Sequence, residues 1–278
     1  YVVLSYKGEE DITLLFSGDY NSVNAFSSRR STFPCNILER PLSMLILEST
    51  YGARKRDDVE HGLFKREIEQ LVEERKTIII PAFAFGRYQT VLYQLKQLED
   101  EGVLGDIPIF MDGGLGLEIT YLWKYLETVE IKDFIPYRAF AVEDRKQIMG
   151  LKTPKIVVTT SGMGNFGPAR EYIPRYISEK WAAIYLTGYT SPDSVSRKIL
   201  ETQDGEVIKV SGIVREKHAI VKCTGEFSSH ARKEDLVNLV RQFKKVNFLM
   251  LSHGDEEAKN SLSKSCYALE NVKDVGIV

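Results

Sequence analysis

Continuous apolar runs that alternate with amphipathic helical patterns fill the middle of this 278-residue chain and constrain its fold more than any other feature. Strands are expected at residues 77–81, 107–111, 155–159 and 182–186, and helices at 57–74, 86–101, 116–126, 168–178 and 192–200. Strands that are apolar throughout are buried on both faces. The pattern therefore predicts an α/β domain with a parallel sheet covered by helices on both sides, of Rossmann-like type.

No nucleotide-binding fingerprint accompanies this alternation. Gly113, Gly114 and Gly116 lie close together, but their spacing fits neither GxGxxG nor a P-loop. We interpret this glycine-rich stretch as a turn.

Shorter strand patterns lie on both sides of the alternating region. Before it, residues 2–5 and 12–16 form a hairpin-like pair, and 44–47 is a buried strand. After it come short β segments at 207–210 and 219–223, helices at 233–244 and 256–269, and strands at 246–251 and 275–278. We expect the two flanks to form one discontinuous domain around the inserted α/β domain.

Composition and charge narrow the class of protein. The 43% hydrophobic and 27% charged residues are typical of a soluble globular protein, and no apolar run approaches the roughly 20 residues of a membrane helix. The net charge of −2 gives no global attraction to nucleic acid, so RNA would need a local basic groove. Cys35, Cys223 and Cys266 are widely separated, which argues against disulfides and a cysteine zinc site and fits a cytoplasmic location.

Four acidic or imidazole side chains occur where predicted strands end or helices begin. Asp19 lies in SGD and Glu48 in ESTYG, each after an apolar strand, while His253 follows a strand in SHGD. His230, in FSSHA, precedes a helix. Carboxylates beside histidines at strand ends suit a zinc site or an acid–base site. Taken singly, each residue could also be a helix cap, a turn residue or a structural histidine.

In this order, the four segments resemble the later motifs of the metallo-β-lactamase-fold β-CASP nucleases, a family that includes ribonuclease J. Segments IPAFAFGR at 80–87, SGM at 161–163 with GP at 167–168, and LTGY at 186–189 resemble landmarks of the β-CASP domain. The resemblance covers essentially the whole chain. It implies part of a metallo-β-lactamase αββα sandwich at 1–54 and 225–278, with a β-CASP domain inserted at 55–224.

The resemblance also implies roles for the four residues. Asp19 corresponds to the carboxylate that bridges two zinc ions, and His253 to a ligand of one of them. His230 corresponds to the histidine that protonates the leaving 3′ oxygen, and Glu48 to the carboxylate that holds it. Two metal ions that share a water nucleophile and brace the phosphate are an established arrangement for phosphodiester hydrolysis.

Further residues are candidates for RNA or phosphate contacts, because arginine and hydroxyl side chains suit phosphate and tyrosine can stack on a base. They are Ser228, Ser229, Ser161, Tyr189 and Arg87. Each of these could equally serve as a helix cap or an ordinary surface residue. We expect Asp255 to cap the last helix.

The sequence departs from the family in one respect. It contains no HxHxDH segment, which begins the family's metal site, and His61 has no second histidine nearby. The chain also begins at Tyr1, within an apparent sheet. We therefore expect these residues to be the C-terminal part of a longer protein, and the chain alone to be inactive or nearly so.

The leading hypothesis is a zinc-dependent ribonuclease that hydrolyses phosphodiester bonds of single-stranded RNA during RNA processing or decay. One alternative is a non-catalytic β-CASP scaffold subunit of an RNA-processing complex; the presence of Asp19, Glu48, His230 and His253 together argues against it. Another is a metallo-β-lactamase-fold hydrolase of a different substrate, such as a small ester or a DNA end. The long inserted domain argues against a small substrate. Endonuclease or exonuclease action, RNA choice and homodimer formation stay open.

Overall fold

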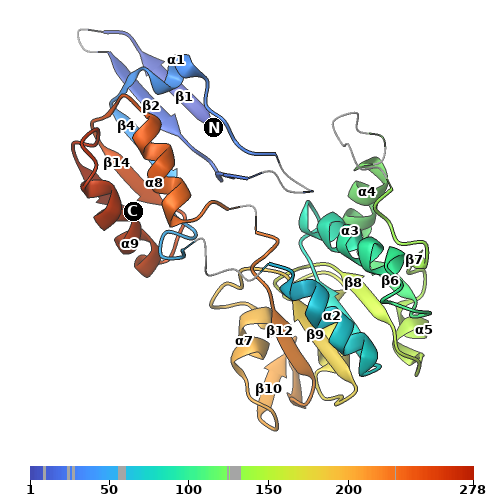
Figure 1. Cartoon of the computed structure of the whole chain (residues 1–278). Coiled ribbons are helices and arrows are strands. Elements are labelled where there is room, and N and C mark those ends of the chain that lie inside the picture. Colours follow the sequence, from blue (N-terminus) through green and yellow to red (C-terminus); the bar gives the residue numbers. More distant parts are fainter. Residues whose placement is uncertain are drawn as a thin grey trace. The chain divides into compact units, whose positions relative to one another are not determined.

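The chain divides into two compact units in the computed structural model, which describes residues 1–8, 11–23, 26, 29–55, 61–123, 125, 133–228 and 230–278 (Figure 1). Unit 1 comprises Tyr1–Val59 and Ser229–Val278, and unit 2 comprises Glu60–Ser228. Unit 1 is thus built from both ends of the chain. Among the described residues, no helix combines the length and the apolar character needed to span a membrane. The assignment of a metallo-β-lactamase domain to 1–54 and 225–278, and of a β-CASP domain to 55–224, stays a prediction.

A six-stranded parallel sheet forms the centre of unit 2. Its order is β12-β9-β5-β8-β6-β7, with every neighbouring pair parallel. The strands are β5 (Thr77–Pro81), β6 (Ile109–Asp112), β7 (Ala139–Ala141), β8 (Ile156–Thr159), β9 (Ala182–Leu186) and β12 (Ile220–Cys223). Every residue of β5 and of β9 is buried. The continuous apolar runs therefore did predict a parallel sheet in a mixed α/β structure.

Helices pack on both faces of this sheet. They are α2 (Leu63–Glu73), α3 (Arg87–Asp100), α4 (Gly114–Trp123), α5 (Arg145–Gly150), α6 (Ala169–Tyr176) and α7 (Val195–Glu201). The ring of Phe64 in α2 lies 5.1 Å from that of Tyr185 in β9, whereas Tyr176 of α6 belongs to the same apolar cluster as Ile184. Because consecutive strand residues point to opposite faces, α2 and α6 cover opposite sides.

Several boundaries differ from the sequence prediction. Helix α4 already begins at Gly114, so the interpretation of this glycine-rich stretch as a turn was wrong beyond Gly113, whose φ is 134°. Within the helix expected at 57–74, α2 begins at Leu63, and residues 56–60 lie outside the described part. Strand β7, helix α5 and the β10 (Val207–Val210) to β11 (Ile213–Glu216) hairpin complete unit 2; only β10 was expected.

Unit 1 contains a five-stranded mixed sheet of order β1-β2-β4-β14-β15. Its strands are β1 (Val2–Tyr6), β2 (Ile12–Phe16), β4 (Met44–Glu48), β14 (Leu249–Ser252) and β15 (Val275–Ile277); only β1 and β2 pair antiparallel. Also in unit 1 are α1 (Cys35–Leu38), α8 (Lys233–Gln242), α9 (Glu256–Tyr267) and the short parallel pair β3 (Pro41–Leu42) with β13 (Lys245–Val246).

The core of unit 1 lies between one sheet face and helices α8 and α9. Leu15, Leu45 and Leu251 are fully buried in one apolar cluster with Leu236 of α8 and Leu262 of α9. Strands β2, β4 and β14 are adjacent and parallel, so their carboxyl ends lie at the same edge of the sheet. This edge is where the predicted acidic and histidine residues occur.

A carboxylate from the far end of unit 2 caps its first helix. Gly62, the N-cap residue of α2, has no side chain with which to cap the helix. Instead Glu226 accepts hydrogen bonds from the backbone N–H groups of Gly62 and Phe64, the latter at 2.7 Å. The ring of Phe227 also lies edge-on to that of Phe64, at 5.0 Å between centroids. The first and last segments of unit 2 are therefore tied together.

We predict that Glu226→Ala lowers the free energy of unfolding by about 1 kcal/mol, the usual cost of losing a helix N-cap acceptor. Amide hydrogen exchange in the first turn of α2 should accelerate. Glu73→Ala, which removes an exposed carboxylate at the other end of the same helix, is the matched control and should leave that exchange unchanged. Unaltered first-turn exchange in Glu226→Ala would contradict the capping role.

Candidate metal centre

Three strand ends and one helix start position the candidate site in unit 1. Asp19 lies three residues after β2, Glu48 is the last residue of β4, and His253 follows β14 directly. The register pairs Ser252 with Glu48, so His253 emerges beside the end of β4. His230 is placed by its neighbour Ala231, whose N–H donates to the Tyr20 carbonyl at 2.7 Å.

The backbone around His253 is held by the segment that follows β4. His253 has a left-handed φ of 53°, and its carbonyl accepts hydrogen bonds from the Ser49 N–H at 3.3 Å and the Thr50 hydroxyl at 3.0 Å. A Cβ on Gly254 would lie 2.6 Å from the Ser49 carbonyl oxygen, so only glycine fits there without displacement. The Thr50 hydroxyl also lies 3.2 Å from His253 Nδ1. These contacts hold the backbone from which the His253 imidazole extends.

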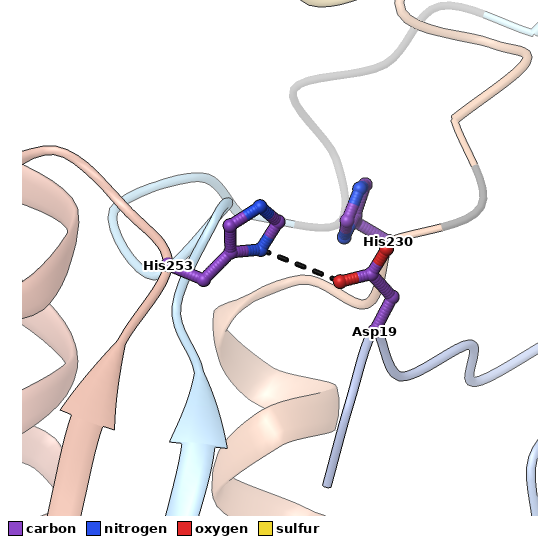
Figure 2. A group of neighbouring side chains, drawn as sticks. All are labelled: Asp19, His230 and His253. Atoms are coloured by element: carbon purple, nitrogen blue, oxygen red, sulfur yellow. Dashed lines mark ion pairs between the residues drawn. The ribbon is translucent and has the colours of Figure 1, made fainter. Parts of the chain in front are cut away.

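Asp19, His230 and His253 converge at this edge (Figure 2). One potential ligand atom from each lies within 4.8 Å of those of the other two, and Asp19 Oδ1 is 3.4 Å from His253 Nδ1. The side chains of Asp19 and His253 are 69% and 61% exposed. Asp19, His253 and Glu48 also line a pocket of about 200 Å³. Carboxylate oxygen and imidazole nitrogen are ligands that zinc accepts, so the residues present fit a zinc ion.

A buried carboxylate holds the third member of this group. Glu48 is only 2% exposed, and its Oε2 lies 2.8 Å from His230 Nδ1. Its other oxygen accepts from the Tyr20 N–H at 2.5 Å. When the Glu48 carboxylate is ionised it can only accept hydrogen bonds, so this contact then requires a proton on Nδ1. Nε2 is then the ring atom that can ligate a metal or, in the imidazolium, deliver a proton.

Sequence reasoning did not identify two residues that support the candidate site. Ser17 accepts a hydrogen bond from the Glu48 N–H at 3.1 Å, and Thr50 contacts His253 as described. Both occur in the SGD and ESTYG segments, so their proximity to the acidic residues was the available signal. The expected N-cap at Asp255 is confirmed, because its carboxylate accepts from the Ala258 N–H at 2.7 Å.

The predicted RNA-contact residues that the structure describes belong to unit 2. Arg87 begins α3 and donates to the Thr187 carbonyl, with its guanidinium against Gly188. Ser161 follows β8 and Tyr189 follows β9, while the N–H of Ser228 donates to the Gly225 carbonyl at 3.3 Å. Ser229 lies outside the described residues. The roles of these residues in binding stay a prediction.

Comparison with known proteins agrees with an α/β metallo-hydrolase. Residues 88–199 match the Beta-Casp domain, and residues 219–275 match the Zn-dependent metallo-hydrolase RNA specificity domain. The second match includes both His230 and His253. The chain therefore contains a Beta-Casp domain, as its motifs indicated, and a Zn-dependent metallo-hydrolase RNA specificity domain.

Archaeal relatives align over most of the chain. An RNase J-like protein of Methanocaldococcus jannaschii is 28% identical over 87% of this chain and 58% of its own length. RNase aCSPSF2 of Saccharolobus solfataricus is 29% identical over 80% of this chain and 44% of its own length. Transcription termination factor FttA of Methanococcus maripaludis is 27% identical, with coverages of 92% and 44%. The chain thus spans about half the length of the curated relatives that it matches.

We predict that Glu48→Ala changes the tautomer of His230. Loss of the carboxylate removes the acceptor that holds the proton on Nδ1, so the population with the proton on Nε2 should rise. Long-range ¹⁵N–¹H correlation spectra of the imidazole measure this ratio. Glu257→Ala, an exposed carboxylate in the first turn of α9, should leave the ratio unchanged. An unaltered ratio in Glu48→Ala would show that Glu48 does not set the tautomer.

Proposed function

We propose that this protein is a zinc-dependent ribonuclease that hydrolyses phosphodiester bonds of single-stranded RNA in RNA processing or decay. The observation that carries the proposal is the convergence of Asp19 and His253 with the Glu48–His230 pair at one sheet edge. The match to a Zn-dependent metallo-hydrolase RNA specificity domain supports the choice of RNA over another substrate. The absence of an HxHxDH segment from the sequence limits the ligands that this chain itself supplies.

Asp19 and His253 are the proposed metal ligands. Both are exposed enough to reach an ion, and neither packs into the core. When bound, zinc supplies Lewis-acid activation of water and stabilises charge on the phosphate. Asp19 and His253 would hold the zinc, and the family resemblance implies two ions in the complete protein. Two side chains leave further coordination positions for water, substrate or other residues.

His230 is the proposed proton donor to the leaving 3′ oxygen. A proton donor must keep a fixed direction toward the atom that it protonates. Glu48 provides this by holding Nδ1, and Glu48 is itself fixed by the Tyr20 N–H. The ring of Tyr51 packs edge-on against that of His230, at 6.1 Å between centroids, and further restricts the imidazole.

We further propose that unit 1 is part of a metallo-β-lactamase αββα sandwich, into which unit 2 is inserted as the β-CASP domain. Helices α8 and α9 cover one face of its sheet. On the other face, Val2, Tyr6 and Ile12 are exposed by 56%, 66% and 43%. An apolar sheet face of this kind suits the packing of a second sheet.

Arg87, Ser161, Tyr189 and Ser228, with Ser229, are the proposed RNA contacts. Their guanidinium, hydroxyl and aromatic groups are chemically suited to phosphate and base binding. We also propose a cytoplasmic location, because three cysteines that are widely separated in the sequence fit a reducing compartment.

We predict that separate substitutions distinguish metal binding from proton transfer. In the longest natural polypeptide that contains this chain, Asp19→Ala and His253→Ala should lose bound zinc, measured by mass spectrometry after desalting. His230→Ala should keep zinc but cleave labelled single-stranded RNA at least about 100-fold more slowly, since general acids contribute at least this much. His61→Ala, at an exposed histidine before α2, is the matched control.

Each other outcome contradicts a specific part of the proposal. Loss of zinc from His230→Ala would make His230 a ligand instead of a proton donor. Full cleavage by His230→Ala would refute its catalytic role. Zinc binding by the wild type without RNA cleavage would favour a scaffold, and hydrolysis of DNA ends or esters instead of RNA would favour a different hydrolase.

A further inference from the structure

Large aromatic side chains are exposed at the carboxyl edge of the parallel sheet in unit 2. Phe83 and Phe85 follow β5, and Phe166 lies in the loop after β8. They are 38%, 72% and 72% exposed. The proposed chemistry of Asp19, His230 and His253 uses none of them. Several exposed rings at one sheet edge mark a binding surface more often than isolated apolar residues do.

The topology of the sheet makes this edge the expected place for a ligand. Strands β5 and β9 are neighbours, but the chain leaves β5 through α3 toward β6, and leaves β9 through α7 toward β12 on the opposite side. Open parallel sheets bind ligands outside the carboxyl ends of strands where the order reverses in this way. The segment that begins at this point after β5 carries Phe83, Phe85 and Arg87.

Contacts join the loops that carry the rings. A Cβ on Gly162 would lie 3.1 Å from the Phe83 ring, so the glycine allows the ring to pack against the loop after β8. In that loop, the Ser161 N–H donates to the Phe166 carbonyl at 3.1 Å. The ring of Phe85 lies 5.8 Å from that of Trp123, which is largely buried. The rings of Phe83 and Phe85 therefore pack against neighbouring residues, and the backbone of Phe166 is held by a hydrogen bond.

A cationic group beside the rings favours a nucleic acid over an apolar protein segment. The guanidinium carbon of Arg87 lies 5.9 Å from the centroid of the Phe83 ring. Aromatic faces beside a cation can hold the bases and backbone of a single strand.

We propose that Phe83, Phe85 and Phe166 form a base-stacking platform for single-stranded RNA. The proposal rests on the proposed ribonuclease function for the identity of the strand. Because every base has an aromatic face, the platform binds bases with little sequence preference. It gives unit 2 a role in holding substrate that is independent of metal.

The test measures binding of a fluorescently labelled, 12-nucleotide single-stranded RNA by anisotropy, with chelator present to prevent metal-dependent cleavage. Phe85→Ala and Phe166→Ala should each weaken binding by about 5-fold to 150-fold, the range for loss of one base–aromatic stack. Phe85→Tyr should retain wild-type affinity, since it keeps the ring. Tyr267→Ala, at a 65% exposed aromatic in α9 of unit 1, is the control and should bind normally.

Two further measurements separate stacking from phosphate attraction. An abasic strand with the same sugar–phosphate backbone should bind the wild type more weakly than RNA, and Phe85→Ala should weaken that binding no further. The salt dependence of RNA binding should be unchanged in Phe85→Ala, because no phosphate contact is removed.

Unchanged RNA affinity in both Phe85→Ala and Phe166→Ala would overturn the platform and leave these rings as a protein-docking surface. Failure of the wild type to bind single-stranded RNA would also overturn it. Since binding is measured with chelator, a failure of cleavage bears only on the proposed ribonuclease function.

Discussion

The organisation of unit 1 depends on the hydrogen bonds made by the buried carboxylate of Glu48. A charged group in a protein interior is costly unless hydrogen bonds satisfy it. One oxygen of Glu48 is satisfied by the Tyr20 N–H and the other faces His230 Nδ1. The same side chain therefore stabilises the turn after β2 and orients a histidine from the far end of the sequence. Fold and site share one group, so neither can be altered there without affecting the other.

Much of the arrangement could be predicted because it depends on local patterns. The fully buried strands β5 and β9 are continuous apolar runs, and such runs define a parallel sheet without reference to any partner. The site is similarly accessible to prediction, because Glu48 and His253 stand at the ends of apolar strands. Adjacent parallel strands bring such ends together whatever the length of the intervening chain.

The rest depended on contacts between distant residues. Glu226 caps a helix that begins more than 160 residues earlier, a contact that no local pattern in the sequence indicates. Thr50 could be recognised only as a neighbour of Glu48, since its contact with His253 arises from the pairing of β4 with β14. Helix α4 begins within a glycine-rich stretch that local propensity assigns to a turn, so packing prevails over propensity there.

The division of unit 1 between both ends of the chain has a consequence for synthesis on the ribosome. Strand β4 pairs with β14, and Leu45 meets Leu249 only after about 200 further residues have been made. Unit 2 is continuous and can fold while the remainder is still being translated. Once unit 2 has folded, the contacts of Glu226 with α2 hold its two ends together. The pairing of β4 with β14 then closes a shorter effective loop. The inserted unit can thus act as an internal folding aid for the unit that surrounds it.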